Sequence, residues 1–252
     1  MKIEKYLVAF LDLLGASDKL QKPDYSCDMI QVAYDMAKNA ISSEHRHSLP
    51  CCKAYTFSDN IALCARIYEE NELQTKLERL ASIVADMMWM NAGMPQNVSL
   101  KGNTFMTPVR GAICYGDLCV DDEMNFIIGE ALANAYILES KKAKVPRVIL
   151  DCGLAKYISN TNIFSRDDDG YYFVDYLCCK CSNKSIIANG IISKHTELIS
   201  TELQRCFSNM INNERKVSKY IWLAKYFNNF ISQHMPIYNK YKVNLDELYI
   251  ID

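Results

Sequence analysis

Two aspartates occupy positions at which a carboxylate needs a chemical explanation. Asp12 interrupts the apolar run AFLDLLGAS, and Asp59 lies in YTFSDNIAL between two strand-like runs. Burying a carboxylate costs free energy unless its charge is neutralised. If the first strand and the hairpin that carries Asp59 are sheet neighbours, the two carboxylates meet at one edge. Mg²⁺ prefers one or two carboxylates together with substrate phosphates, so the pair predicts a site where two divalent cations, Mg²⁺ or Mn²⁺, act on a phosphate-bearing substrate.

Each aspartate also has a purely structural interpretation. Asp59 lies in a tight turn, where Asp is common because its side chain bonds the nearby backbone. Asp12 fits this interpretation less well, because turns rarely begin within an apolar run. Gly15 follows it, with the small residues Ala16 and Ser17 behind. Such a glycine lets backbone N–H groups approach an anion closely, which makes Gly15 a candidate substrate contact.

The elements that must position these residues follow from apolar periodicity. Strands are expected at residues 6–14, 51–57, 61–67, 109–115, 126–128, 146–150 and 171–177, and helices at 24–43, 71–92, 129–142, 194–212 and 215–232. A polar loop is expected at 91–107, and a hairpin around Gly116 and Asp117 and then Asp121 and Asp122. Strands and helices that alternate around a central hairpin predict an α+β fold of the βαββαβ type.

Composition limits the classes of partner. The formal net charge is −2, which gives no electrostatic case for a nucleic acid. No run approaches the ~18–20 apolar residues of a membrane span, and the amino-terminal segment lacks the features of a signal peptide. Because the 11 cysteines are scattered and odd in number, we expect a cytoplasmic protein with free thiols. Cys178, Cys179 and Cys181, with His195 downstream, lack the spacing of a zinc site.

Four segments, taken in order, resemble the catalytic domain of class III nucleotide cyclases. They are AFLDLLGAS, YTFSDNIAL, VRGAICYG and IIGEALANAYILE, and they span roughly residues 5–151. The resemblance implies a ferredoxin-like core within residues 1–180 and a mostly helical extension over 181–252, packed on the core or on a dimer partner. It implies Asp12 and Asp59 as metal ligands, with the Leu13 carbonyl as a further one. It also implies a head-to-tail homodimer with composite active sites.

Two departures from the family pattern concern recognition of the base. The position at which purine cyclases usually carry a base-reading Lys is Tyr55, and the position that is commonly acidic in adenylate cyclases is Phe126. A phenol can hydrogen-bond a pyrimidine edge, and its ring fills the volume that a smaller base leaves. These features resemble the pyrimidine cyclases of Pycsar antiphage defence. That resemblance implies a UTP or CTP substrate and a cyclic product that acts on a separate effector.

A third departure concerns the transition state. The helix Asn and Arg of the family fall at Ala133 and Ile137, and Asn134 is one residue out of register. Arg110 is the candidate replacement, since a guanidinium fork suits phosphate oxygens, with Lys142 or Lys141 behind it. Substituting Lys for Tyr55 is expected to erode base preference more than folding. A purine cyclase with an unusual base pocket, and a nucleotide-binding regulatory module without turnover, remain open as alternatives.

Overall fold

The computed structural model describes most of the chain. The described residues are 2–15, 49, 51–91, 107–121, 123–159, 162–181, 189–208 and 214–246. The helix expected at residues 24–43 and nearly all of the loop expected at 91–107 lie outside them.

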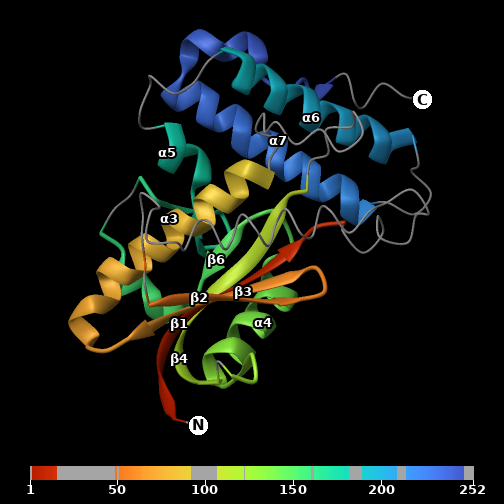
Figure 1. The fold of residues 1–252 in the computed structure, drawn as a ribbon. Helices are drawn as coiled ribbons and strands as arrows, with labels where there is room; N and C mark the ends of the chain where they lie inside the picture. Colours follow the sequence, from red (N-terminus) through yellow and green to blue (C-terminus); the bar gives the residue numbers. More distant parts are fainter. Residues whose placement is uncertain are drawn as a thin grey trace.

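An eight-stranded sheet forms the centre of the molecule (Figure 1). The strands are β1 (Ile3–Leu13), β2 (Cys52–Phe57), β3 (Asn60–Ile67), β4 (Val109–Asp121), β5 (Phe126–Ile128), β6 (Val148–Leu150), β7 (Phe164–Arg166) and β8 (Tyr172–Val174). Their order is β2-β3-β1-β4-β6-β8-β7, with β5 paired to β4. β1 lies between β3 and β4 and is antiparallel to both. This order of the first four strands is that of a ferredoxin-like βαββαβ sheet, so the expected α+β fold is confirmed.

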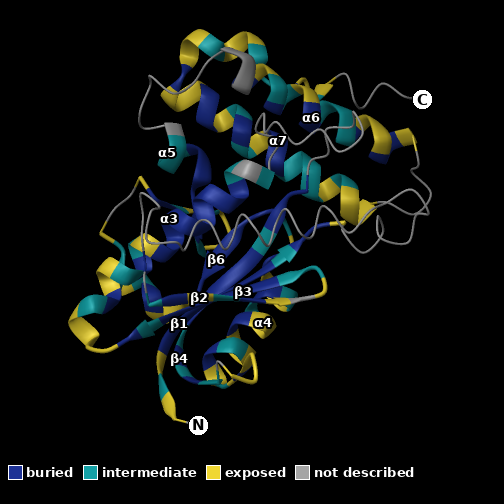
Figure 2. Cartoon of the chain, viewed as in Figure 1, coloured by how far each residue is buried: buried dark blue, intermediate teal, exposed yellow. Residues whose placement is uncertain are grey.

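The strand β1 contributes to two cores because successive side chains point to opposite faces of the sheet. Leu7 and Leu11 belong to the large core under α3 (Leu73–Asn91). Val8 and Phe10 belong to a smaller core under α4 (Glu130–Lys142). Figure 2 shows the resulting buried strands between the two helices.

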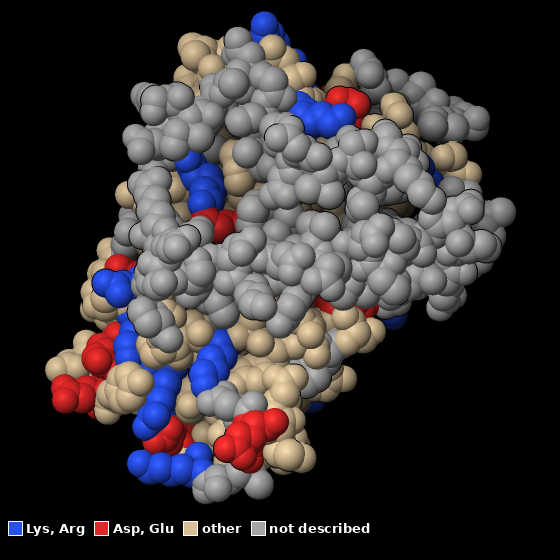
Figure 3. All heavy atoms as spheres, viewed as in Figure 1, with Lys and Arg blue, Asp and Glu red and all other residues tan. Residues whose placement is uncertain are grey.

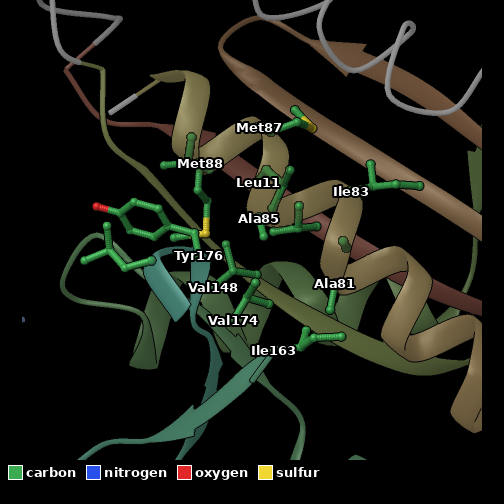
Figure 4. Close-up of a cluster of buried hydrophobic side chains, with 14 of the residues drawn as sticks. Leu11, Ala81, Ile83, Ala85, Met87, Met88, Val148, Ile163, Val174 and Tyr176 are labelled. Atoms are coloured by element: carbon green, nitrogen blue, oxygen red, sulfur yellow. The ribbon is translucent and has the colours of Figure 1, made fainter. Parts of the chain in front are cut away.

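The large core is continuous from the sheet into the helices after it. Figure 4 shows Ala85 of α3 beside Leu11 of β1, and Met88 beside Tyr176. The later helices are α5 (Tyr176–Cys181), α6 (Asn189–Ser208) and α7 (Glu214–His234), and the 3-10 helices are η1 (Glu70–Glu72), η2 (Cys152–Tyr157) and η4 (Pro236–Tyr241). Phe227 of α7 is fully buried in the same core as Leu11. The C-terminal helices therefore share the main core, while the division near residue 180 stays a prediction.

Polar contacts fix α7 to the far edge of the sheet. Trp222 Nε1 donates to Asp167 Oδ2 at 3.0 Å, and the Tyr226 hydroxyl donates to Asp175 Oδ1 at 2.5 Å. Arg147, which is buried, forms an ion pair with the same Asp167. Hydrogen bonds between buried groups constrain orientation as well as contributing stability, so α7 has a defined position relative to the sheet.

The expected hairpin at Gly116 and Asp117 is wrong, because β4 continues to Asp121. Gly116 has another role: a Cβ there would lie 3.4 Å from the backbone nitrogen of Ala131 in α4. The glycine permits close helix–strand packing, and the chain turns only after Asp121. Only the second part of the predicted turn is therefore confirmed.

The strand expected at residues 171–177 ends earlier, at Val174. Asp175 accepts a hydrogen bond from the backbone nitrogen of Cys178 at 2.9 Å. A side-chain oxygen bonding the third N–H is a helix N-cap, so α5 begins at the next residue. Cys178 and Cys179 therefore lie in a helix. Among the described helices, none is long and apolar enough to cross a membrane.

Candidate active site

Asp12 stands in a row of polar residues across three strands. Its register partners are Asn60 on β3 and Arg110 on β4. Strand alternation places it on the same face as Phe10, under α4. Its side chain is 15% exposed, so a carboxylate at the end of an apolar strand is largely withdrawn from water and needs cationic or donor partners.

Asp59 is held beside the end of β1 by the backbone. Leu13 donates its N–H to the Asp59 carbonyl at 3.2 Å. Ser58, which precedes Asp59 in the β2–β3 turn, has a positive φ of 58°. Asn60 Nδ2 donates to Asp59 Oδ1 at 3.3 Å. The two aspartates, far apart in the sequence, thus come from neighbouring strand ends at one edge of the sheet.

Arg110 forms ion pairs with two carboxylates. Its Nε lies 2.6 Å from Asp12 Oδ2 and 2.7 Å from Glu139 Oε1. The side chain is 24% exposed, so both pairs are partly shielded from solvent. Arg110 therefore contacts Asp12, but its charge is engaged by carboxylates of the chain itself, and its contact with phosphate stays a prediction.

Glu139 is a residue of this site that the sequence analysis missed. It lies on the inner face of α4, with only 3% of the residue exposed. Burial raises the pKa of its carboxyl, while Arg110 opposes that rise. Among the described residues, its Oε1 has no aligned hydrogen-bond donor beyond the ion pair. The spacing of Ala131, Ala135 and Glu139, four residues apart each time, was the available signal, since such residues share one helix face.

Gly15 and Lys142 lie near the site without a contact that assigns them a role. Gly15 has a φ of +77°, and a Cβ there would meet nothing within 4 Å. Glycine is therefore suited to this position by its left-handed backbone conformation. The anion contact proposed for Gly15 stays a prediction. Lys142 is exposed at the last turn of α4. The roles of the Leu13 carbonyl and of Lys142 also remain predictions.

Tyr55 lies on the same sheet face as Asp12. It pairs with Ala62 on β3 and is 4% exposed, in the core that includes Phe10. A lysine at this position would bring a charge into an apolar cluster. Tyr55→Lys should therefore cost folding stability, and whether it costs base preference more stays a prediction.

Phe126 is remote from the aspartates within one chain. It pairs with Asp121 on β4 and is 43% exposed. At ~3.3 Å per residue, the stretch of β4 from Arg110 to Asp121 is about 36 Å long. Ala133 and Ile137 both lie on the exposed side of α4. One subunit therefore brings Asp12, Asp59 and Arg110 together and leaves Phe126 outside the group.

The carboxylates suit a divalent cation in number and kind. In the described part of the chain, no group of three or more His, Cys, Asp or Glu residues could hold a metal ion alone. A pair of aspartates leaves coordination positions for substrate phosphates, which is the arrangement Mg²⁺ favours. Cys178, one of the three cysteines near residue 180, has its Sγ 3.6 Å from His234 Nε2. His195 does not make this contact; its Nε2 lies 3.2 Å from the Tyr176 hydroxyl.

Comparisons with known proteins give matches only among solved structures. No family model and no curated protein matches the chain. The crystal structure of the guanylyl cyclase Cya2 aligns over 69% of this chain and 92% of that chain, with 11% identity and a TM-score of 0.48. The adenylyl cyclase CyaB from P. aeruginosa aligns over 69% and 94%, with 16% identity and a TM-score of 0.49.

A third similar structure is a class III adenylyl cyclase-like ATP-binding protein from Pseudomonas aeruginosa. It covers 92% of this chain and 44% of that chain, with 11% identity and a TM-score of 0.43. At identities this low, the similarity does not establish the chemistry. The chemistry must be inferred from the residues of the site itself.

Proposed function

We propose that this protein is a nucleotide cyclase that converts UTP or CTP into the 3′,5′-cyclic monophosphate and pyrophosphate. The observation that carries the proposal is that Asp12, at the end of β1, and Asp59, in the β2–β3 turn, lie on neighbouring strand ends. Two carboxylates so placed, without a third, suit a cation that is completed by phosphate oxygens. A nucleoside triphosphate supplies such oxygens together with a sugar hydroxyl that can attack the α-phosphate.

In this proposal, Asp12, Asp59 and the Leu13 carbonyl hold two divalent cations, Mg²⁺ or Mn²⁺. When bound, the cations lower the proton affinity of the 3′-hydroxyl and neutralise charge on the phosphates. The chain itself supplies position: the backbone bond from Leu13 to the Asp59 carbonyl fixes the turn against β1. Arg110 orients Asp12 from the neighbouring strand. Catalysis is then mostly alignment and charge neutralisation.

A head-to-tail homodimer would complete the site. The exposed apolar side chains of β5 and α4 and of the turn before β5 support an interface: Met124, Phe126, Ile128, Tyr136 and Ile137. Since Phe126 lies far along β4 from its own aspartates, it would serve the partner's nucleotide. The aromatic rings of Tyr55 and Phe126 favour a pyrimidine over a purine. The cyclic product would act in the cytoplasm as a second messenger for a separate effector in antiviral defence.

The second candidate is a nucleotide-binding regulatory module without turnover. Arg110 is the observation that favours it, because two carboxylates of the chain engage its charge. Ala133 and Ile137 on α4, where the family pattern has an Asn and an Arg, carry no charge that could bind the phosphates in place of Arg110. A purine cyclase with an unusual base pocket is the third alternative.

One assay separates these functions. Purified protein is incubated with Mn²⁺ and each of the four nucleoside triphosphates, and cyclic products and pyrophosphate are separated by liquid chromatography. The proposal predicts conversion of UTP or CTP in preference to ATP and GTP. Preferential conversion of a purine would select the purine cyclase. Nucleotide binding without pyrophosphate release, with Mn²⁺ and also when Mg²⁺ replaces it, would select the regulatory module.

A further inference from the structure

In the part of the chain that the structure describes, the guanidinium beside Asp12 is that of Arg110, and Asp12 and Glu139 share it. A charge balanced by two carboxylates binds an additional anion less strongly than an unbalanced one. A triphosphate therefore needs positive charge from another element at this edge of the sheet.

The first half of α7 approaches the same region from the C-terminal part of the chain. Trp222 packs against a cluster that contains Ala112 of β4 and Ala143, the residue that follows α4. Lys219 precedes Trp222 by three positions, and residues three apart share a helix face. The lysine is half-buried. Its stem therefore lies toward the C-terminal end of α4, which also carries Glu139.

Electrostatics agrees with this placement. Lys144 and Lys219 both oppose the rise that burial causes in the pKa of Glu139. Lys144 Nζ also donates to the Ser140 carbonyl at 2.7 Å, which holds it at the end of α4. Two ammonium groups from different elements thus act on the carboxylate that contacts Arg110. Figure 3 shows Lys and Arg side chains interspersed with Asp and Glu on the described surface of the face in view.

We propose that Lys219 of α7, together with Lys144, binds the phosphate chain of the nucleotide at the edge of the sheet beside Asp12. The inference rests on the proposed function and assigns the missing phosphate contact to the C-terminal helix. Lysine is a flexible point charge on a long stem, which suits a phosphate chain that moves as pyrophosphate leaves. The hydrogen bond from Trp222 to Asp167 keeps α7 in register with α4.

A base-free probe tests this contact independently of turnover. Inorganic tripolyphosphate, with Mg²⁺ in fixed excess, is titrated into the full-length protein in a calorimeter. Lys219→Ala is expected to raise the dissociation constant about tenfold, which is about 1.4 kcal/mol, because it removes a hydrogen bond to a charged group. Lys219→Arg should retain most of the affinity. Lys225→Ala is the matched control, because Lys225 is an exposed lysine on another face of α7.

The outcomes separate this inference from the proposed function. Tripolyphosphate binding that depends on Lys219, in a protein that makes no cyclic nucleotide, upholds the inference and removes the cyclase. An active cyclase in which Lys219→Ala and Lys225→Ala have equal affinity and equal KM overturns the inference alone. Circular dichroism of each variant checks the fold. If Lys219→Ala lowers melting temperature and Lys219→Arg fails to restore binding, the lysine is structural and the inference is also overturned.

Discussion

Arg110 and Asp12 face each other as register partners on β4 and β1, with Nε 2.6 Å from Oδ2. The same nitrogen lies 2.7 Å from Glu139 on α4. One guanidinium therefore ties the strand end that carries the aspartate to the helix above it. The candidate site and the packing of α4 share this group, so a change in one affects the other.

Arg110→Ala should destabilise the protein by about 3 kcal/mol, because it leaves the Glu139 carboxylate buried without the guanidinium that pairs with it. Adding Glu139→Gln to the same chain should recover part of the loss, since the amide carries no charge. Urea denaturation of the single and double variants measures both effects. A single variant as stable as the wild type would show that the ion pair contributes nothing to folding.

The stability contributed by Glu139 should depend on pH. Burial raises the folded-state pKa of its carboxyl above the ordinary value, so the folded protein holds the proton more tightly than the unfolded chain. The stabilisation from this proton is complete below the unfolded pKa and is lost as pH rises through the folded pKa. Relative to Glu139→Gln, the wild type should therefore lose stability as the pH rises above the ordinary titration range of a glutamate. A difference that is constant across this range, measured by urea denaturation, would contradict the assignment.

Tyr55 offers a test of base recognition that respects its burial. Tyr55→Phe removes only the hydroxyl, so it should cost about 1 kcal/mol in stability while reducing the preference for pyrimidine over purine triphosphates. Tyr55→Lys should cost about 2 kcal/mol or more, because it places a charge in the core. Competition assays with paired nucleotides measure preference, and thermal melts measure folding. Unchanged preference in Tyr55→Phe would remove the hydroxyl from base recognition.

The attachment of α7 can be tested at Trp222. Trp222→Phe removes the donor to Asp167 and should destabilise the protein by about 2 kcal/mol, since hydrogen bonds to charged groups contribute about 1.5–3 kcal/mol. Asp167→Asn keeps an acceptor for the indole but removes the charge that pairs with the buried Arg147, so it should cost at least as much. Guanidinium denaturation monitored by far-ultraviolet circular dichroism compares the two. A Trp222→Phe variant as stable as the wild type would show that the indole stabilises α7 by packing alone.

Thiol reactivity is expected to follow burial among the described cysteines. Burial raises the pKa of Cys64 and of Cys114 to about 12, whereas Cys152 is exposed. Only the thiolate reacts rapidly with alkylating agents. Iodoacetamide at pH 8, followed by peptide mass spectrometry, should label Cys152 and leave the two strand cysteines unlabelled. Early labelling of Cys64 would indicate that β3 opens readily.

Much of the fold was predictable from the periodicity of apolar residues and from the turn residues between the apolar runs. The apolar run ending at Leu13 and the hairpin at Ser58 and Asp59 gave neighbouring strands in the order the structure has. The predicted turn at Gly116 is wrong because glycine is common both in turns and at close packing contacts. Only the tertiary contact with Ala131 distinguishes the two. The start of α5 was missed because the capping role of Asp175 depends on where β8 ends.

The site was predictable only in part. Asp12 and Asp59 were identified because a carboxylate in or beside an apolar strand is costly, and the sheet brings both to one edge. Glu139 was missed because its burial depends on how α4 lies over β1 and β4. Phe126 was grouped with the site by resemblance, and the length of β4 separates it from the aspartates within one chain. Contacts that depend on how a helix lies over the sheet therefore could not be predicted from the sequence.

The most direct test of the central claim is the rate of cyclic nucleotide formation by Asp12→Asn and Asp59→Asn. Each variant is incubated with saturating Mn²⁺ and the preferred triphosphate, with wild type and Lys225→Ala as references. We predict that both aspartate variants lose at least about 100-fold in rate and keep their fold by circular dichroism, since each removes a charge from the cation site. Wild-type rates in either aspartate variant would contradict the account.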